Sequence, residues 1–64
     1  MELQKQMERK VGFEEDDSGE ITLGRIKAIT SKFINGKKIH LYLIQILDRK
    51  EQIVLEENQF KFWG

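Results

Sequence analysis

Residues 21–47, ITLGRIKAITSKFINGKKIHLYLIQIL, decide the fold of this chain. Two runs rich in β-branched and aliphatic residues flank Asn35-Gly36 in this stretch. Asn-Gly between two such runs favours a type I′ hairpin turn, because both central residues of that turn need a positive φ. We therefore predict two antiparallel strands, at about 21–34 and 37–47.

The two predicted strands carry further detail. Gly24 lies inside the first strand, which indicates a bulge, a bend or the close approach of another chain segment. A two-residue turn at Asn35-Gly36 places Ala28 opposite Leu43. The second strand is apolar on both faces over 39–47, so we expect it to be central in the sheet and covered on both sides.

Shorter elements flank this hairpin. A short first strand is predicted at 11–14, followed by a loop at 14–20 that holds five acidic residues and the turn-forming Ser18-Gly19. Residues 2–10 are good helix formers, and we expect a helical or flexible lead-in over 1–10, before a domain that spans 11–64. After the hairpin we expect a turn at 48–51, a strand at 52–56, a helical turn at 57–60 and a last strand at 61–63.

Length and composition limit what the chain can be. Its 64 residues, of which 39% are hydrophobic, suffice for one domain with a small core. The chain contains no cysteine, which excludes disulfides, thiolate catalysis and zinc sites built on cysteine. There is no apolar signal segment, and the apolar run at 39–47 is too short to cross a bilayer. We expect a soluble, cytoplasmic protein.

Charge is balanced in total but unevenly distributed. Eleven bases and eleven acids give a net charge of zero, which argues against a simple polyanion binder and allows self-association. Residues 1–20 hold seven acids and three bases, whereas 21–47 hold five bases and no acid. Residues 48–64 hold four acids and three bases. The sequence therefore predicts a dipolar molecule.

The predicted order of elements resembles the SH3-like small-barrel superfold, which includes SH3, Tudor and KOW-type domains. The stretches that carry the resemblance are 24–29, 40–46, 52–55 and the helical turn at 57–60, and it extends over about 10–63. It implies a mainly β fold, a five-stranded barrel, with the acidic stretch in the long first loop. The chain has no proline and its one tryptophan is Trp63, so recognition of proline-rich peptides is not implied.

No catalytic residue, metal ligand or cofactor site is expected. His40 is the only histidine, and no nucleophile or acid stands at a recognisable spacing from it. The acidic residues of 14–20 do not follow the ligand spacing of a calcium loop. A solvated loop, or an element that docks on a basic partner, explains them better.

The excess of apolar residues is the most informative feature for function. We assign to the inner face Val11, Ile26, Ala28, Leu41, Leu43, Leu55 and either Ile53 or Val54. A binding surface for a protein is then predicted at Phe33, Tyr42, Ile44, Phe60, Phe62 and Trp63. A bulge at Gly24 would shift the face assignment by one residue and remove part of this surface.

These observations favour a small non-enzymatic module that binds and modulates a larger partner protein, such as a phage or mobile-element protein acting on a host complex. One alternative is a nucleic-acid or nucleotide binder, in which the anion-binding residues are Arg25, Lys27, Lys37 and Lys38. Another alternative is a homo-oligomer that encloses a small ligand between its subunits.

Overall fold

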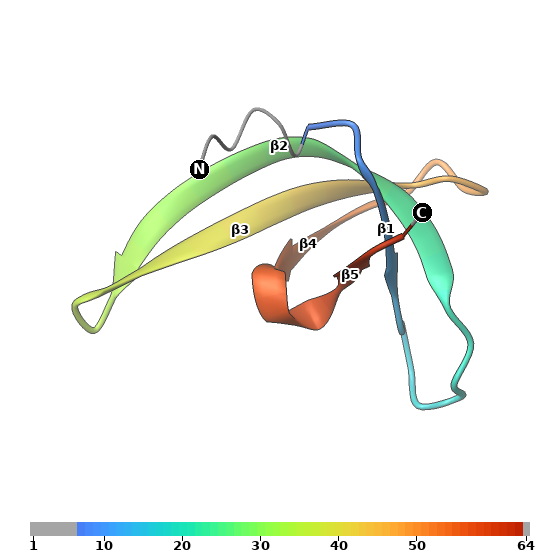
Figure 1. Cartoon of the computed structure of the whole chain (residues 1–64), viewed down its shortest axis with the longest axis horizontal. Helices are drawn as coiled ribbons and strands as arrows, with labels where there is room; N and C mark the ends of the chain where they lie inside the picture. Colours follow the sequence, from blue (N-terminus) through green and yellow to red (C-terminus); the bar gives the residue numbers. More distant parts are fainter. Residues whose placement is uncertain (1–6, 64) are drawn as a thin grey trace.

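The structure is a computed structural model that describes residues 7–63. Five antiparallel strands form one sheet in the order β4-β3-β2-β1-β5 (Figure 1). The elements are β1 (Lys10–Phe13), β2 (Thr22–Ile34), β3 (Lys37–Ile46), β4 (Gln52–Glu56), the 3₁₀ turn η2 (Glu57–Gln59) and β5 (Lys61–Phe62). The prediction of a mainly β fold with five antiparallel strands is confirmed.

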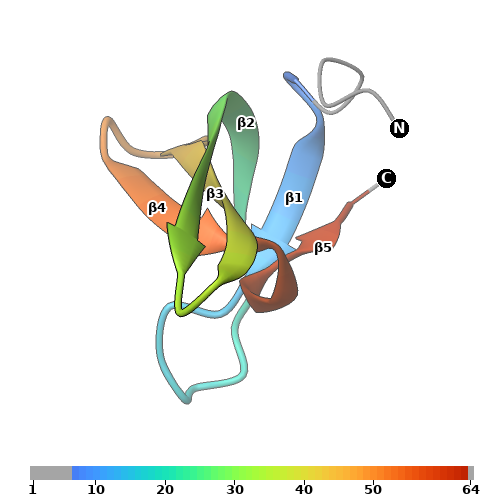
Figure 2. The ribbon, with the colours of Figure 1, turned by 90° about the vertical axis from the view of Figure 1, so that its left-hand side faces the viewer.

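The sheet is open but strongly curled. The long strand β2 pairs with β1 through its first residues, from Thr22 to Arg25, and with β3 from Gly24 to its end. Figure 2 shows β4 and β5 at opposite edges of the curled sheet, with β2 and β3 between them. The concave side of this sheet encloses the core.

Aromatic and aliphatic side chains from β1, β2, β3 and the segment after η2 form the core, and two partly buried side chains of β4 pack against it. Tyr42 is 1% exposed and meets the ring of Phe60 edge to face, with 5.0 Å between the ring centroids. The turn η2 brings Phe60 under the sheet, and the backbone N–H of Glu56 donates to Oε1 of Gln59 across that turn at 2.8 Å. The buried residues are Val11, Phe13, Ile26, Tyr42, Ile44, Ile46 and Phe60.

The predicted hairpin register is confirmed from Ala28, which lies opposite Leu43, up to the turn. A register shift between Ile26 and Ala28 places a bulge at Lys27. Gly24 marks a close approach instead, because a Cβ there would lie 2.5 Å from Cγ2 of Ile44. A side chain at this position would therefore clash with β3.

The bulge makes part of the predicted inner face wrong, although Val11, Ile26, Ile53 and Leu55 contact the core as predicted. Ile26 and Ile29 both face the core, although they are three residues apart, because the extra residue reverses the alternation of the strand. On β3 the core face is Tyr42, Ile44 and Ile46. Ala28, Leu41, Leu43 and Val54 consequently lie on the convex side of the sheet. β3 is central, as predicted, but within residues 7–63 no second layer covers its convex side.

Most of the predicted lead-in lies outside the described residues. Within residues 7–9 the chain makes a turn and continues alongside β2, with the N–H of Glu8 donating to the carbonyl of Ile26 at 2.8 Å. Across residues 7–63 there is no helix of the length and apolar character needed to span a membrane.

Candidate functional site

The six residues predicted as a protein interface do not form one surface. Tyr42, Ile44 and Phe60 are buried in the core, which excludes their side chains from an exposed patch. Phe33 is exposed at the far end of the β2–β3 hairpin, whereas Phe62 and Trp63 lie at β5. Tyr42 and Ile44 face the core because of the bulge between β2 and β3, and Phe60 does so because it follows η2 under the sheet.

The surface beside β5 is small and already partly covered by the chain itself. The guanidinium carbon of Arg9 lies 3.9 Å from the centroid of the Phe62 ring, a cation–π contact. Trp63 packs over Gly12, where an added Cβ would lie 2.7 Å from the indole ring. The backbone N–H of Trp63 donates to the carbonyl of Lys10 at 2.8 Å. These contacts tie the end of the chain to β1.

The convex side of β2, β3 and β4 carries a continuous set of apolar side chains, which we call the outer face: Ala28, Ile39, Leu41, Leu43 and Val54. The register sets Leu43 between Ala28 and Val54 on the neighbouring strands. Val54, on the edge strand β4, is 57% exposed. Residues on paired strands hold fixed positions, so the outer face is a preformed surface.

Residues 31–40, which we call the arm, form the second exposed feature. β4 pairs with β3 only from Leu41 to Gln45, and β1 pairs with β2 only from Thr22 to Arg25. The arm is therefore a two-stranded ribbon that extends beyond the rest of the sheet (Figure 1). Its turn has φ of 51° at Asn35 and 78° at Gly36, as the predicted type I′ turn requires.

The arm is basic on both of its sides. Lys38 lies opposite Phe33 on the side that continues the core face, while Lys32 and Lys37 lie on the other side. None of these three lysines has a carboxylate partner within residues 7–63. Phe33 is 73% exposed. The arm thus combines unpaired positive charge with an exposed aromatic ring.

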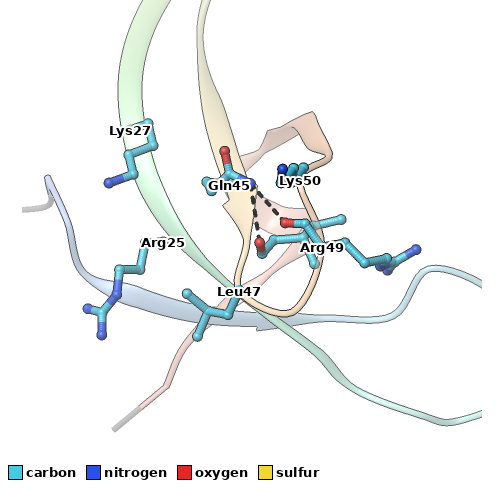
Figure 3. A pocket seen from close by; sticks show the side chains of 7 residues that line it. Arg25, Lys27, Gln45, Leu47, Arg49 and Lys50 are labelled. Carbon is cyan, nitrogen blue, oxygen red and sulfur yellow. Dashed lines mark hydrogen bonds between the residues drawn. The ribbon is translucent and has the colours of Figure 1, made fainter.

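The four residues predicted to bind anions are separated by the structure. Lys37 and Lys38 lie on the arm, whereas Arg25 and Lys27 line a hollow of about 380 Å³ on the body of the sheet (Figure 3). Nζ of Lys27 lies 2.6 and 2.7 Å from the two carboxylate oxygens of Glu8. The charge of Lys27 in this hollow is therefore already neutralised by the chain.

Two bases of the same hollow, Arg49 and Lys50, were not singled out in the sequence. They belong to the turn between β3 and β4, which Gln45 stabilises by donating from Nε2 to the carbonyls of Ile46 and Arg49 at 3.2 and 3.1 Å. In Figure 3 the guanidinium of Arg49 points away from Arg25, and it is paired with Glu15. The cationic groups do not converge on one point, so the hollow is a weak candidate for an anion site.

Side chains of the acidic loop form hydrogen bonds within the loop and to the first residue of β2. Oδ1 of Asp16 accepts the backbone N–H of Ser18 at 2.9 Å, and Oε1 of Glu15 accepts the hydroxyl of Thr22 at 2.8 Å. The hydrogen bond from the Thr22 hydroxyl lowers the pKa of Glu15, and the hydrogen bond from Arg49 lowers it further. Among residues 7–63 no group of three or more acidic or histidine side chains is placed to hold a metal ion.

His40 has a hydroxyl partner but lacks the rest of a catalytic arrangement. Oγ of Ser31 lies 2.8 Å from its Nδ1, across the two strands of the arm. Within the described part of the chain no carboxylate is hydrogen-bonded to the other ring nitrogen, which is how a catalytic base is usually oriented. The pair fits a cross-strand contact on an exposed ribbon.

The chain matches no protein-family model, no curated protein and no solved structure in the comparisons made with each.

Proposed function

We propose that the chain is a small non-enzymatic module with an SH3-like barrel fold, which docks onto a larger partner protein through the outer face. The fold assignment is supported by the strand order β4-β3-β2-β1-β5, by the long acidic loop between β1 and β2 and by the 3₁₀ turn before β5. Because this superfold serves many functions, the functional proposal depends on the surface alone.

The observation that carries the proposal is the apolar outer face, on which Ala28 and Val54 are exposed and the residues of β3 are half-buried. Val54 is more than half exposed, and Leu43 and Leu41 lie beside it on the central strand. Contiguous apolar side chains on a rigid surface of a small protein are typical of an interface with another molecule. A charged rim is present as well, because Leu41 lies opposite Glu56 and Ile39 lies opposite Lys32. Such a rim supplies orientation while the apolar centre supplies affinity.

A binding role is favoured over catalysis by the shape of the molecule. The surface hollows are shallow, and the Ser31–His40 pair lies on a two-stranded ribbon without an oriented third group. The lack of cysteine suits a reducing cytoplasm. A role in which a phage or mobile-element protein modulates a host complex is consistent with a surface of this kind.

The experiment is affinity capture from a cytoplasmic lysate with the wild-type chain and with Val54→Lys. Ile21→Lys is the matched control, because Ile21 is an exposed apolar residue that lies in the loop before β2, away from the outer face. We expect Val54→Lys to lose a defined partner that the wild type and Ile21→Lys both retain, while thermal unfolding shows that all three chains remain folded.

Two results would contradict this proposal. Equal capture by Val54→Lys and by the wild type would remove the outer face from the interface. Native mass spectrometry that shows a stable dimer, dissociated by Val54→Lys alone, would assign the outer face to a second copy of the chain, which is the homo-oligomer alternative.

A further inference from the structure

The arm concentrates three lysines without internal counter-charges in the described part of the chain on one exposed ribbon. Lys27 is paired with Glu8, and Arg49 is paired with Glu15. Lys32, Lys37 and Lys38 have no such partner within residues 7–63, and no acid occurs anywhere in 21–47. The acidic loop lies at the opposite end of the molecule from the arm (Figure 1). A molecule with zero net charge therefore presents a locally positive projection.

The side chain of Phe33 does not pack in the core of the fold. The bulge at Lys27 places Phe33 on the side of β2 that continues the core face, but the core ends near Tyr42 and Ile29. The ring is left 73% exposed, directly opposite Lys38. An exposed aromatic ring beside unpaired lysines can stack on a base while the ammonium groups contact phosphates.

We propose that the arm binds single-stranded nucleic acid, with Phe33 stacked on an unpaired base and Lys32, Lys37 and Lys38 on the phosphate backbone. Accessible base faces are needed for this stacking, and a duplex does not offer them without being unstacked. The stacking site is distinct from the outer face, since Phe33 and Lys38 lie on the opposite side of the ribbon from Ile39. Lys32 lies opposite Ile39 and therefore borders both surfaces.

An anionic lipid surface fits the arm less well. Insertion into a bilayer interface requires several apolar side chains that point in one direction. Phe33 and Ile34 are consecutive residues of β2 and therefore project to opposite sides of the ribbon. On the side that carries Phe33 and Lys38 the arm therefore offers one large apolar side chain to a membrane, which gives weak and reversible attachment at best.

The test is fluorescence anisotropy of a labelled oligonucleotide of about 12 nucleotides, titrated with the chain at salt concentrations from about 50 to 200 mM. We expect Phe33→Ala to weaken binding about tenfold without changing the salt dependence. The double variant Lys37→Gln/Lys38→Gln should reduce the slope of log K against log salt by about 1.4, because each lost phosphate contact on a single strand removes about 0.7.

The matched control is Lys50→Gln/Lys61→Gln, which changes the net charge equally at exposed lysines outside the arm. Far-ultraviolet circular dichroism establishes that each variant is folded, and Val54→Lys should bind like the wild type. Any of the following would overturn the proposal: no binding at about 50 mM salt, equal losses in the control, no effect of Phe33→Ala, or equal affinity for a duplex of the same sequence. Binding to vesicles of anionic lipid in place of the oligonucleotide would overturn it as well.

Discussion

The two halves of the β2–β3 hairpin are built from the same strands but have different surroundings. In the body of the sheet, Ile44 and Tyr42 are covered by β1, η2 and the residues packed beneath them. In the arm, the same hydrogen-bonded ladder continues to Ile34 and Lys37 with no third strand and no covering layer within residues 7–63. A turn sequence therefore determines whether a hairpin forms, whereas the elements around the hairpin determine which of its residues are structural and which are available for binding.

The bulge at Lys27 connects these two halves. It allows Ile26 and Ile29 to share the core face, and it sets the orientation of every later residue of β2. Phe33 thereby continues the line of the core beyond the end of the core. Phe33 is therefore exposed on the core side of β2, where its ring can contact a ligand.

The largest expected difference between the halves is in packing energy. Ile44→Ala removes a fully buried side chain and should lower the free energy of unfolding by about 2–5 kcal/mol, which is enough to unfold much of a small domain. Ile34→Ala, the same change in the arm, should cost about 0.5 kcal/mol or less because Ile34 is 42% exposed. Urea denaturation of both variants measures the contrast, and similar losses would show that the arm is packed in solution.

A glycine in each half gives a second contrast. Gly24→Ala places a methyl group 2.8 Å from the carbonyl oxygen of Gln45, so we expect a loss of about 1–3 kcal/mol from overpacking. Gly36→Ala meets no atom within 4 Å and is opposed only by the positive φ of 78°, with a net cost of about 1 kcal/mol. Amide chemical shifts of β3 should move widely in Gly24→Ala and only near the turn in Gly36→Ala. Widespread shifts in both variants would contradict this distinction.

The success of prediction from the sequence also differs between the arm and the body of the sheet. Asn35-Gly36 and the β-rich runs fixed both strands and the register of the arm, because turn chemistry and alternation are local properties. The faces in the body could not be predicted, since the bulge at Lys27 depends on how β2 serves both β1 and β3. The hollow lined by Arg25 and Arg49 could not be predicted either, because it forms only when strands distant in the sequence pair.

Alkaline pH should weaken the body but not the arm. Burial raises the pKa of Tyr42 above its ordinary value of 10.0, and the nearby Glu57 carboxylate raises it further. Above about pH 10 the unfolded chain therefore loses the phenolic proton more readily than the folded chain, so stability falls as the pH rises toward the folded pKa. Thermal unfolding as a function of pH measures this decline, and Tyr42→Phe should make it shallower. An unchanged slope in Tyr42→Phe would assign the decline to other groups.

The smallest expected effect concerns the ion pair that joins the acidic loop to the β3–β4 turn. The hydrogen bonds that Glu15 accepts from Thr22 and Arg49 lower its pKa below the ordinary value of 4.5, so this carboxylate stabilises the fold above that pH and ceases to do so as the pH falls through its folded pKa. Glu15→Gln should therefore lower the thermal midpoint slightly at neutral pH and make it less sensitive to acid.

Glu14→Gln is the control for this change, because Glu14 is an exposed neighbour with no ion pair among residues 7–63. It should leave the acid dependence unchanged. If instead Lys37→Gln altered that dependence as much as Glu15→Gln, the arm lysines would have carboxylate partners in solution. The distinction between the ion-paired Arg49 of the body and arm lysines that are available to a ligand would then be lost.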